Sequence, residues 1–155
     1  FQGRAGSDSM RSRVRVERGD SGRRYAVSRE YAVPPERAWS VLANTESWPT
    51  WGPTVSAVRP AEATVREGLT GEVQVLGGPW VPFEVTAVEG KANDHVRRWT
   101  WSVARIPATG HRVERTDAGC RVVFEVPLLA GGYVPVCQRA LGDLAETVED
   151  RESRT

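Results

Sequence analysis

Residues 34–53 read "PPERAWSVLANTESWPTWGP", and this stretch decides the fold because it joins a short amphipathic segment to a broken one that carries two tryptophans. The two prolines cannot lie inside a helix, but they can begin one. Ala38, Val41 and Leu42 then share one face at helical spacing. The part from residue 45 onward contains too much proline and glycine for more than a single helical turn. We therefore expect a short helix and then one turn.

Segments on both sides of this stretch have the pattern of β-strands. Residues 23–33 precede it, and further strand candidates follow at 55–61, 69–76, 81–88, 95–104, 111–116 and 120–127. The short connections between them favour antiparallel neighbours. Apolar residues from Tyr133 to Val148 recur at steps of three and four, which predicts one long terminal helix with Pro135 in its first turn. The expected fold class is α+β, with two short helices after the first strand.

The length of 155 residues suits one domain, which we place at residues 23–150. Residues 1–9 have the character of an expression-tag remnant, because Met10 is the only methionine. The arginine-rich residues 10–22 are interpreted as a flexible basic arm, and residues 151–155 as a tail. The arm has no interleaved aromatic residues for stacking on bases, and the net charge is only +1, so nucleic acid is not an expected partner.

Several other classes of protein lack support in the sequence. No apolar run approaches the roughly 20 residues that cross a bilayer, and no apolar signal-peptide core is visible, so we expect a cytoplasmic protein without integral membrane association. Cys120 and Cys137 have no metal-type spacing and are expected to be free thiols. No metal site, phosphate-binding loop or other cofactor motif is found, so no metal and no cofactor is expected. Both a monomer and a homodimer remain open.

Four segments together carry a resemblance to a known superfamily. "YAVPPERAWSVLANTESWPTWGPTV", "GPWVPFEVTAVEG", "RWTWSV" and "GCRVVFEVP", followed by a final helix, resemble the SRPBCC superfamily. This superfamily includes StAR-related lipid-transfer domains, birch-pollen-allergen-like proteins and polyketide cyclase/dehydrase-like proteins. The resemblance covers about residues 23–150 and is most specific in the proline-led helix and the tryptophans behind it.

The resemblance implies a helix-grip fold, in which a curved antiparallel sheet wraps around the long C-terminal helix. It implies a small hydrophobic molecule, aromatic, polyketide-like or lipid-like, as the partner in a cavity between sheet and helix. It would place Trp51 in the core and Trp48 at its edge. It carries over no catalytic residue, because the superfamily is held together by its fold and not by an invariant catalytic set.

The two-residue period of a strand identifies candidates for the inner face of the sheet. Trp99, Trp101 and Val103 share one face, as either a sheet core or an aromatic wall for a ligand. The connection 105–110 and the region around Tyr133 are expected to form the entrance. The full set of expected ligand-binding residues is Trp80, Phe83, Trp99, Trp101, Val103, Val113, Arg115 and Tyr133.

His111 is the candidate for chemistry, in step with Val113 and Arg115 on a largely apolar face. A histidine there could move a proton near neutral pH, or it could be a hydrogen-bonded structural residue. Arg115 could hold a ligand carboxylate or enolate, or form a surface ion pair. Three functions stay open: a carrier or sensor of a hydrophobic molecule, a polyketide cyclase/dehydrase-like enzyme with His111 as acid and base, and a protein-interaction module.

Overall fold

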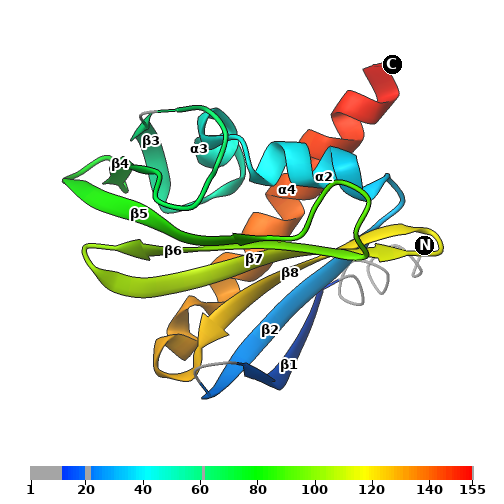
Figure 1. The fold of residues 1–155 in the computed structure, drawn as a ribbon, viewed down its shortest axis with the longest axis horizontal. Helices are drawn as coiled ribbons and strands as arrows, with labels where there is room; N and C mark the ends of the chain where they lie inside the picture. Colours follow the sequence, from blue (N-terminus) through cyan, green and yellow to red (C-terminus); the bar gives the residue numbers. More distant parts are fainter. Residues whose placement is uncertain (1–11, 20–21, 61, 155) are drawn as a thin grey trace, which may run out of the picture.

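The computed structural model describes residues 12–19, 22–60 and 62–154. Figure 1 shows two short helices between the first two strands and the remaining strands, and the long helix at the C-terminal end. Their order is β1 (Ser12–Gly19), β2 (Gly22–Tyr31), α2 (Pro35–Leu42), the 3₁₀ turn η1 (Thr45–Ser47), α3 (Trp48–Trp51), β3 (Val55–Pro60), β4 (Thr70–Val75), β5 (Trp80–Glu89), β6 (Val96–Val103), β7 (Ile106–Thr116), β8 (Gly119–Pro127), the 3₁₀ segment η2 (Leu128–Tyr133) and α4 (Val134–Arg154).

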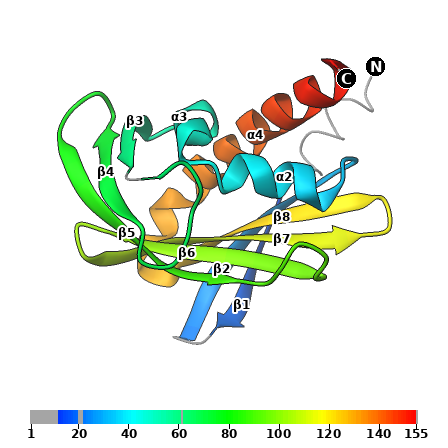
Figure 2. The same cartoon turned by 45° about the horizontal axis from the view of Figure 1, so that its top comes forward.

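The strands form one eight-stranded antiparallel sheet in the order β1-β2-β8-β7-β6-β5-β4-β3. All neighbours along the sheet are consecutive in sequence except β2 and β8, which are brought together after the chain has crossed to the far edge and returned. The register shifts between Val85 and Ala87 and between Thr100 and Ser102. Such irregularities bend a strand and increase its twist. In Figure 2 the β3–β4–β5 part of the sheet curls up beside α3.

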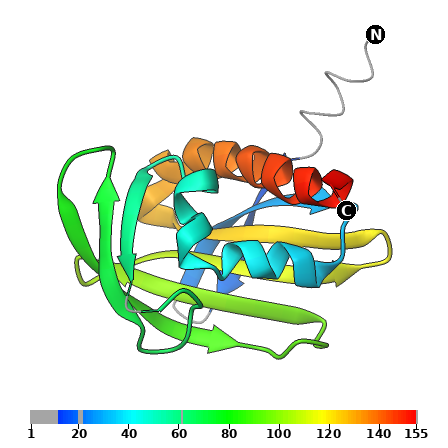
Figure 3. The same cartoon turned by 90° about the horizontal axis from the view of Figure 1, so that it is seen from above.

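Helix α4 covers the concave face of this sheet, with α2 and α3 beside it (Figure 3). Its apolar stripe is buried against the strands: Cys137, Ala140, Leu141, Leu144, Ala145 and Val148. The hydroxyl of Tyr31 on β2 donates a 2.7 Å hydrogen bond to the carbonyl oxygen of Leu141, which ties the middle of α4 to the sheet. The predicted α+β helix-grip architecture is confirmed.

The segment between α2 and β3 closes one end of this core. Pro35 begins α2, and the Asn44 side chain accepts a hydrogen bond from the backbone N–H of Glu46 to begin η1. Trp48 was expected at the edge of the core, but it is only 2% exposed. Its ring stacks on Trp99 at 5.2 Å, and its Nε1–H donates to the carbonyl oxygen of Leu42 at 3.0 Å. Because a neighbouring carbonyl satisfies its one polar group, the whole ring can be buried.

Two expectations about the chain ends are corrected. Residues 12–19, expected to lie in a flexible arm, form strand β1, in which Val14 lies opposite Val27 and Val16 opposite Tyr25. The alternation of valines with charged residues suits an edge strand, and pairing with β2 satisfies its backbone. Residues 151–154, expected as a tail, continue α4. The suggested tag remnant at 1–9 lies outside the described residues.

The connection 105–110, expected as an irregular entrance loop, belongs to β7. A tight turn at Ala104 and Arg105, with φ of 54° and 68°, joins β6 directly to β7. Positive φ at both central residues is the geometry that matches the twist of paired strands. The β6–β7 turn lies at the end of the sheet that η2 reaches, because β8 ends there at Pro127.

Candidate functional site

Two adjoining chambers lie between the concave face of the sheet, the α3–β3 connection and the start of α4. The inner chamber has a volume of about 40 Å³ and includes Trp51, Trp99, His111, Phe124 and Cys137 in its lining. The outer chamber has a volume of about 260 Å³, and its walls are mainly Val73, Val75, Val103, Pro107, Ala108, Val126, Pro127 and Ala130. The chambers share Thr54, Val55, Trp101, Thr109 and Tyr133. A small hydrophobic molecule could therefore occupy both.

An aromatic stack forms the rear of the inner chamber. Trp99 is sandwiched between Trp48 on one side, at 5.2 Å, and the His111 ring on the other, at 3.9 Å. Trp101 packs edge-to-face with Trp48 and Phe124 with His111, with ring centroids 5.1 and 5.4 Å apart. Stacked and edge-to-face contacts of this kind are the favoured geometries of aromatic pairs. The rear wall is thus rigid, flat and apolar.

His111 lies at the centre of this wall with both ring nitrogens engaged. Its Nδ1 lies 3.4 Å from the backbone oxygen of Trp99, which can only accept, so Nδ1 carries the proton. Its Nε2 lies 3.1 Å from Oγ1 of Thr109, and the hydroxyl therefore donates to it. The indole Nε1–H of Trp101 in turn donates to Oγ1 of Thr109 at 3.3 Å. In this series of hydrogen bonds, which begins at the Trp101 indole and ends at the Trp99 backbone oxygen, every proton has an acceptor.

The ionisable groups of the two chambers are held in their neutral forms. Burial lowers the pKa of His111 to about 3, and the bond to Trp99 offsets this only in part. Burial raises the pKa of Cys137 to about 12. It also raises the pKa of Tyr133 above its ordinary value, against the weaker effect of the Thr54 hydrogen bond. No Asp, Glu, Lys or Arg of the described chain lines either chamber, so the walls carry no charge at neutral pH.

A hydrogen bond between Tyr133 and Thr54 links the α3–β3 connection to η2. The hydroxyl oxygens of the two side chains lie 2.8 Å apart and share one hydrogen bond. Tyr133 directly precedes α4, and Thr54 directly precedes β3, so this bond joins the two segments that border the chambers. Three apolar side chains at this end of the sheet are exposed: Leu76 in the β4–β5 turn, Ile106 at the start of β7 and Leu129 in η2.

The structure brings only part of the predicted site together. His111, Trp99, Trp101, Val103 and Tyr133 line the chambers. Trp80 instead lies under the guanidinium of Arg59, 3.7 Å from its ring centroid. Phe83 packs against Trp48 and Trp101, behind the wall, and Val113 is buried in the core but lines neither chamber.

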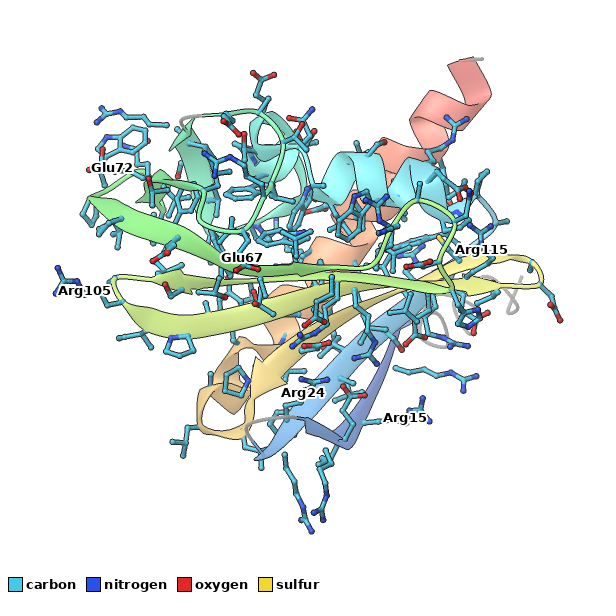
Figure 4. All side chains as sticks on the ribbon, viewed as in Figure 1. Arg15, Arg24, Glu67, Glu72, Arg105 and Arg115 are labelled. Atoms are coloured by element: carbon cyan, nitrogen blue, oxygen red, sulfur yellow. The ribbon has the colours of Figure 1, made fainter. Side chains whose placement is uncertain are left out.

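Arg115 does not face the cavity. Its guanidinium forms a 2.6 Å ion pair with Glu36 of α2, and its side chain is 39% exposed. Figure 4 shows Arg105 and Arg115 at opposite ends of β7, with the chambers near the Arg105 end. Of the two alternatives for Arg115, the structure therefore shows the surface ion pair and not the side chain directed into the cavity, because Glu36 of α2 holds Arg115 at the far end of the strand.

Several lining residues were missed by sequence reasoning. Thr109 could have been found, since the period of two places it on the same face as His111. Thr54, Val55 and Cys137 carry no local signal, because their place in the site depends on how α3 and α4 pack on the sheet. Among the described residues, no cluster of His, Cys, Asp and Glu could hold a metal ion. No described helix has the length and apolarity needed to span a membrane.

Comparisons with known proteins agree with this architecture. The structure is similar to that of a STAR-related lipid transfer protein from Xanthomonas axonopodis, with a TM-score of 0.64 and 15% identity over 90% of this chain and 94% of that one. Protein Ms6760 from Mycobacterium smegmatis has a TM-score of 0.60 and 18% identity, over 90% of this chain and 99% of that one. Hypothetical protein jhp0584 from Helicobacter pylori has a TM-score of 0.63 and 13% identity, over 79% of this chain and 84% of that one.

No curated protein matches the chain in sequence. One family model does match, over residues 22–149, and its description is polyketide cyclase/dehydrase and lipid transport. The match includes the proline-led helix, the sheet from β2 to β8 and most of α4. The chain therefore belongs to the polyketide cyclase/dehydrase and lipid transport family, within the SRPBCC superfamily.

Proposed function

We propose that the protein binds a small, uncharged hydrophobic molecule in the two chambers and acts as its carrier or sensor. The observation that carries the proposal is the lining: apolar and aromatic side chains over about 260 Å³ in the outer chamber, and no ionised group in either chamber at neutral pH. Ligand sites are typically concave and apolar, with a few placed polar groups. The family description, which includes lipid transport, supports this class of ligand.

The family description also includes cyclases and dehydrases, for which His111 was the candidate acid and base. A general base works best with a pKa near the operating pH, whereas the pKa of His111 is about 3. Its Nε2 is already occupied by the Thr109 hydroxyl. These two observations favour binding over proton transfer, and in our proposal His111 orients Thr109 and supports the Trp99 stack.

The test has two parts. Native mass spectrometry of gently purified protein detects any co-purified molecule, and calorimetry measures the binding of a neutral probe, 2-isopropenylnaphthalene. Val103 lines the outer chamber, so Val103→Phe should fill part of it and weaken probe binding by about tenfold or more. Val96, an exposed residue on the same strand that lines neither chamber, provides the matched control Val96→Phe.

A co-purified hydrophobe that is lost in Val103→Phe and kept in Val96→Phe would support the proposal. If neither a co-purified molecule nor the probe binds, or if both variants bind the probe as the unmodified chain does, the proposal is wrong.

A further inference from the structure

Four exposed apolar side chains gather at the end of the sheet where the outer chamber lies. Leu76 in the β4–β5 turn is 72% exposed, and Ile106 at the start of β7 is 67% exposed. Leu128 and Leu129 in η2 are exposed as well, the latter completely. Figures 1 and 3 show the β4–β5 turn, the β6–β7 turn and η2 on the same side of the molecule. We call these four residues the apolar rim.

The apolar rim is continuous with the wall of the outer chamber. The β4–β5 turn, the start of β7 and η2 each place a rim residue directly beside residues that line this chamber: Val75, Pro107, Pro127 and Ala130. The backbone N–H of Leu76 also donates to the carbonyl oxygen of Thr54 at 3.0 Å, which fixes the β4–β5 turn beside the chamber. Apolar surface therefore extends from the chamber to the outside of the protein.

Single exposed apolar side chains are ordinary, whereas a group of them marks a surface that contacts something apolar. Among the described residues, the other exposed large apolar side chains are all valines: Val14 and Val16 on the edge strand β1, and Val96 on β6. Every strongly exposed leucine or isoleucine in this part of the chain thus belongs to the apolar rim. The longest apolar side chains are exposed where the cavity lies, and this placement requires an explanation.

Cationic side chains flank the apolar rim. Arg105 directly precedes Ile106 and projects outward from the β6–β7 turn (Figure 4). Arg23 is exposed at the start of β2, one residue beyond the pairing of Arg24 with Pro127, and so lies near the start of η2. The segments that carry the rim, residues 76–79, 104–107 and 128–133, contain no Asp or Glu. This end of the molecule therefore combines apolar tips with positive charge.

We infer that the apolar rim docks the protein on the surface of an anionic lipid bilayer. Its four side chains lie between the lipid headgroups, and Arg23 and Arg105 lie against the phosphates. Aliphatic side chains beside arginines are the combination that binds such a surface, through buried apolar area and attraction to anionic lipids. The inference goes beyond the proposed function, because it says where a hydrophobic ligand is exchanged: directly between the bilayer and the outer chamber, without crossing water.

A protein partner fits the apolar rim less well. Stable protein interfaces are continuous surfaces of about 800 Å² on each side. The rim residues instead lie on separate segments around a cavity, with the glycines of the β4–β5 turn and of η2 between them: Gly77, Gly78, Gly131 and Gly132. A second copy would also bring two sets of arginines to one interface, with no carboxylate in the rim segments to match them. A fluid bilayer adapts to separate tips and supplies the negative charge.

The first experiment measures flotation of the full chain with vesicles of equal parts phosphatidylcholine and phosphatidylglycerol, and with vesicles of phosphatidylcholine alone. The protein should bind the anionic vesicles, and at least about tenfold more weakly the neutral ones. The double variant Leu129→Ser with Ile106→Ser should lower binding to the anionic vesicles by about tenfold or more, whereas Val96→Ser, at the opposite end of the sheet, should not. Absence of binding, or an equal loss in both variants, would overturn the inference.

A second readout locates the contact on the protein. Both natural cysteines are buried, so a thiol-reactive, polarity-sensitive dye can be attached to Leu129→Cys or, as the control, to Val96→Cys. Anionic vesicles should shift the emission of the dye at position 129 to shorter wavelength and leave the dye at position 96 unchanged. Vesicle binding without a shift at position 129 would mean that another face docks, and would overturn the inference.

The charge is tested with a matched pair of single variants. Arg105→Gln should weaken binding to the anionic vesicles by about fivefold, because it removes one cation at the bilayer surface. Lys91→Gln removes the same charge at the opposite end of the sheet, where the attraction is screened, and should have an effect of less than about twofold. Equal effects would mean that the protein adsorbs through its charge without a preferred orientation, contrary to the inference.

Calorimetry with 2-isopropenylnaphthalene, in the absence of vesicles, separates docking from ligand binding. The double variant should bind this probe as the unmodified chain does, because neither substituted residue lines a chamber. Intact probe binding without any vesicle binding would overturn docking and leave the proposed function standing, whereas vesicle binding without probe binding would do the reverse. A dimer that is lost in the double variant, found by sedimentation in a protein that binds no vesicles, would assign the apolar rim to a second copy.

Discussion

Phe124 and Glu125 are neighbours on β8, yet they point to opposite faces of the sheet and into opposite environments. Phe124 lies on the concave face, where its ring packs against Trp51 and His111. Glu125 lies on the convex face, only 3% exposed, where three arginines surround its carboxylate. The two faces differ in the same way one strand away, where His111 of β7 faces inward and Arg112 outward.

The convex face is held together by charge. Arg98 of β6 donates to both oxygens of Glu125, with distances of 2.8–3.0 Å, and Arg112 of β7 donates to Oε2 at 2.7 Å. Arg112 and Arg24 also bind Glu17 of β1, so the network spans five strands. Figure 4 shows Arg24 on β2 close to the β1 edge. Burial alone would raise the pKa of Glu125, but the arginines outweigh it and hold that pKa below its usual range.

The comparison shows how a single sheet can carry a charge network and a neutral cavity on opposite sides. Strand alternation separates the two by the thickness of the backbone, and the buried Glu125 carboxylate on the convex face is matched by three arginines. The concave face is then free to exclude charge, which is the property that our proposed ligand class requires. The cavity and the network should therefore respond to different perturbations.

The largest expected effect comes from removing the carboxylate at the centre of the network. Glu125→Ala leaves Arg98 and Arg112 partly buried without their shared partner, and we expect the free energy of unfolding to fall by about 3–5 kcal/mol. Glu72→Ala, which breaks an exposed pair with Arg59, should cost less than about 1 kcal/mol. Urea denaturation measures both. Equal costs would show that the convex network is no more than a set of surface ion pairs.

The pH dependence of stability should separate the faces. The unfolded chain protonates His111 below pH 6.5, whereas the folded chain keeps it neutral down to a pKa of about 3. Its contribution is thus complete above pH 6.5 and is lost as the pH falls toward 3, by about 1.4 kcal/mol per pH unit. Arg112 and Arg24 lower the pKa of Glu17 to about 2, against the effect of burial, so its contribution is lost only between pH 4.5 and 2.

Between pH 6.5 and 4.5, the free energy of unfolding should therefore fall because of His111 on the concave face alone. His111→Phe should flatten the slope in that window, and His95→Gln, at an exposed turn, serves as the control. Denaturation at a series of pH values provides the measurement. A slope in His111→Phe equal to that of the unmodified chain would mean that another group carries the dependence.

The sequence predicts which face a side chain occupies better than it predicts where along that face it lies. Alternation correctly placed His111, Trp99 and Trp101 inward, because this property depends only on the local strand. It could not distinguish Phe83, which packs behind Trp48, from Val103, which lines the outer chamber. That distinction depends on where α3 and α4 cover the sheet and where they leave a cavity, which is a property of the whole fold.

Strand β1 was missed for a different reason. Its residues alternate valine with arginine and glutamate, which is the pattern of an edge strand, but the density of charge suggested a solvated arm. The charges are accommodated because Glu17 reaches Arg24 on β2 and Arg112 on β7. The last of these partners lies 95 residues away in the chain, so no local pattern could have revealed it.

Arg115 gives the smallest expected effect and the sharpest test of the boundary between cavity and surface. Alternation places it on the same face as His111, but its ion pair with Glu36 is exposed on both sides, at 39% and 49%. Arg115→Ala should therefore cost less than about 1 kcal/mol of unfolding free energy and leave the affinity for 2-isopropenylnaphthalene unchanged, by denaturation and calorimetry. A marked loss of affinity would mean that the ligand reaches the far end of β7. Because Glu36→Ala breaks the same pair from α2, only a loss confined to Arg115→Ala would assign Arg115 to the ligand.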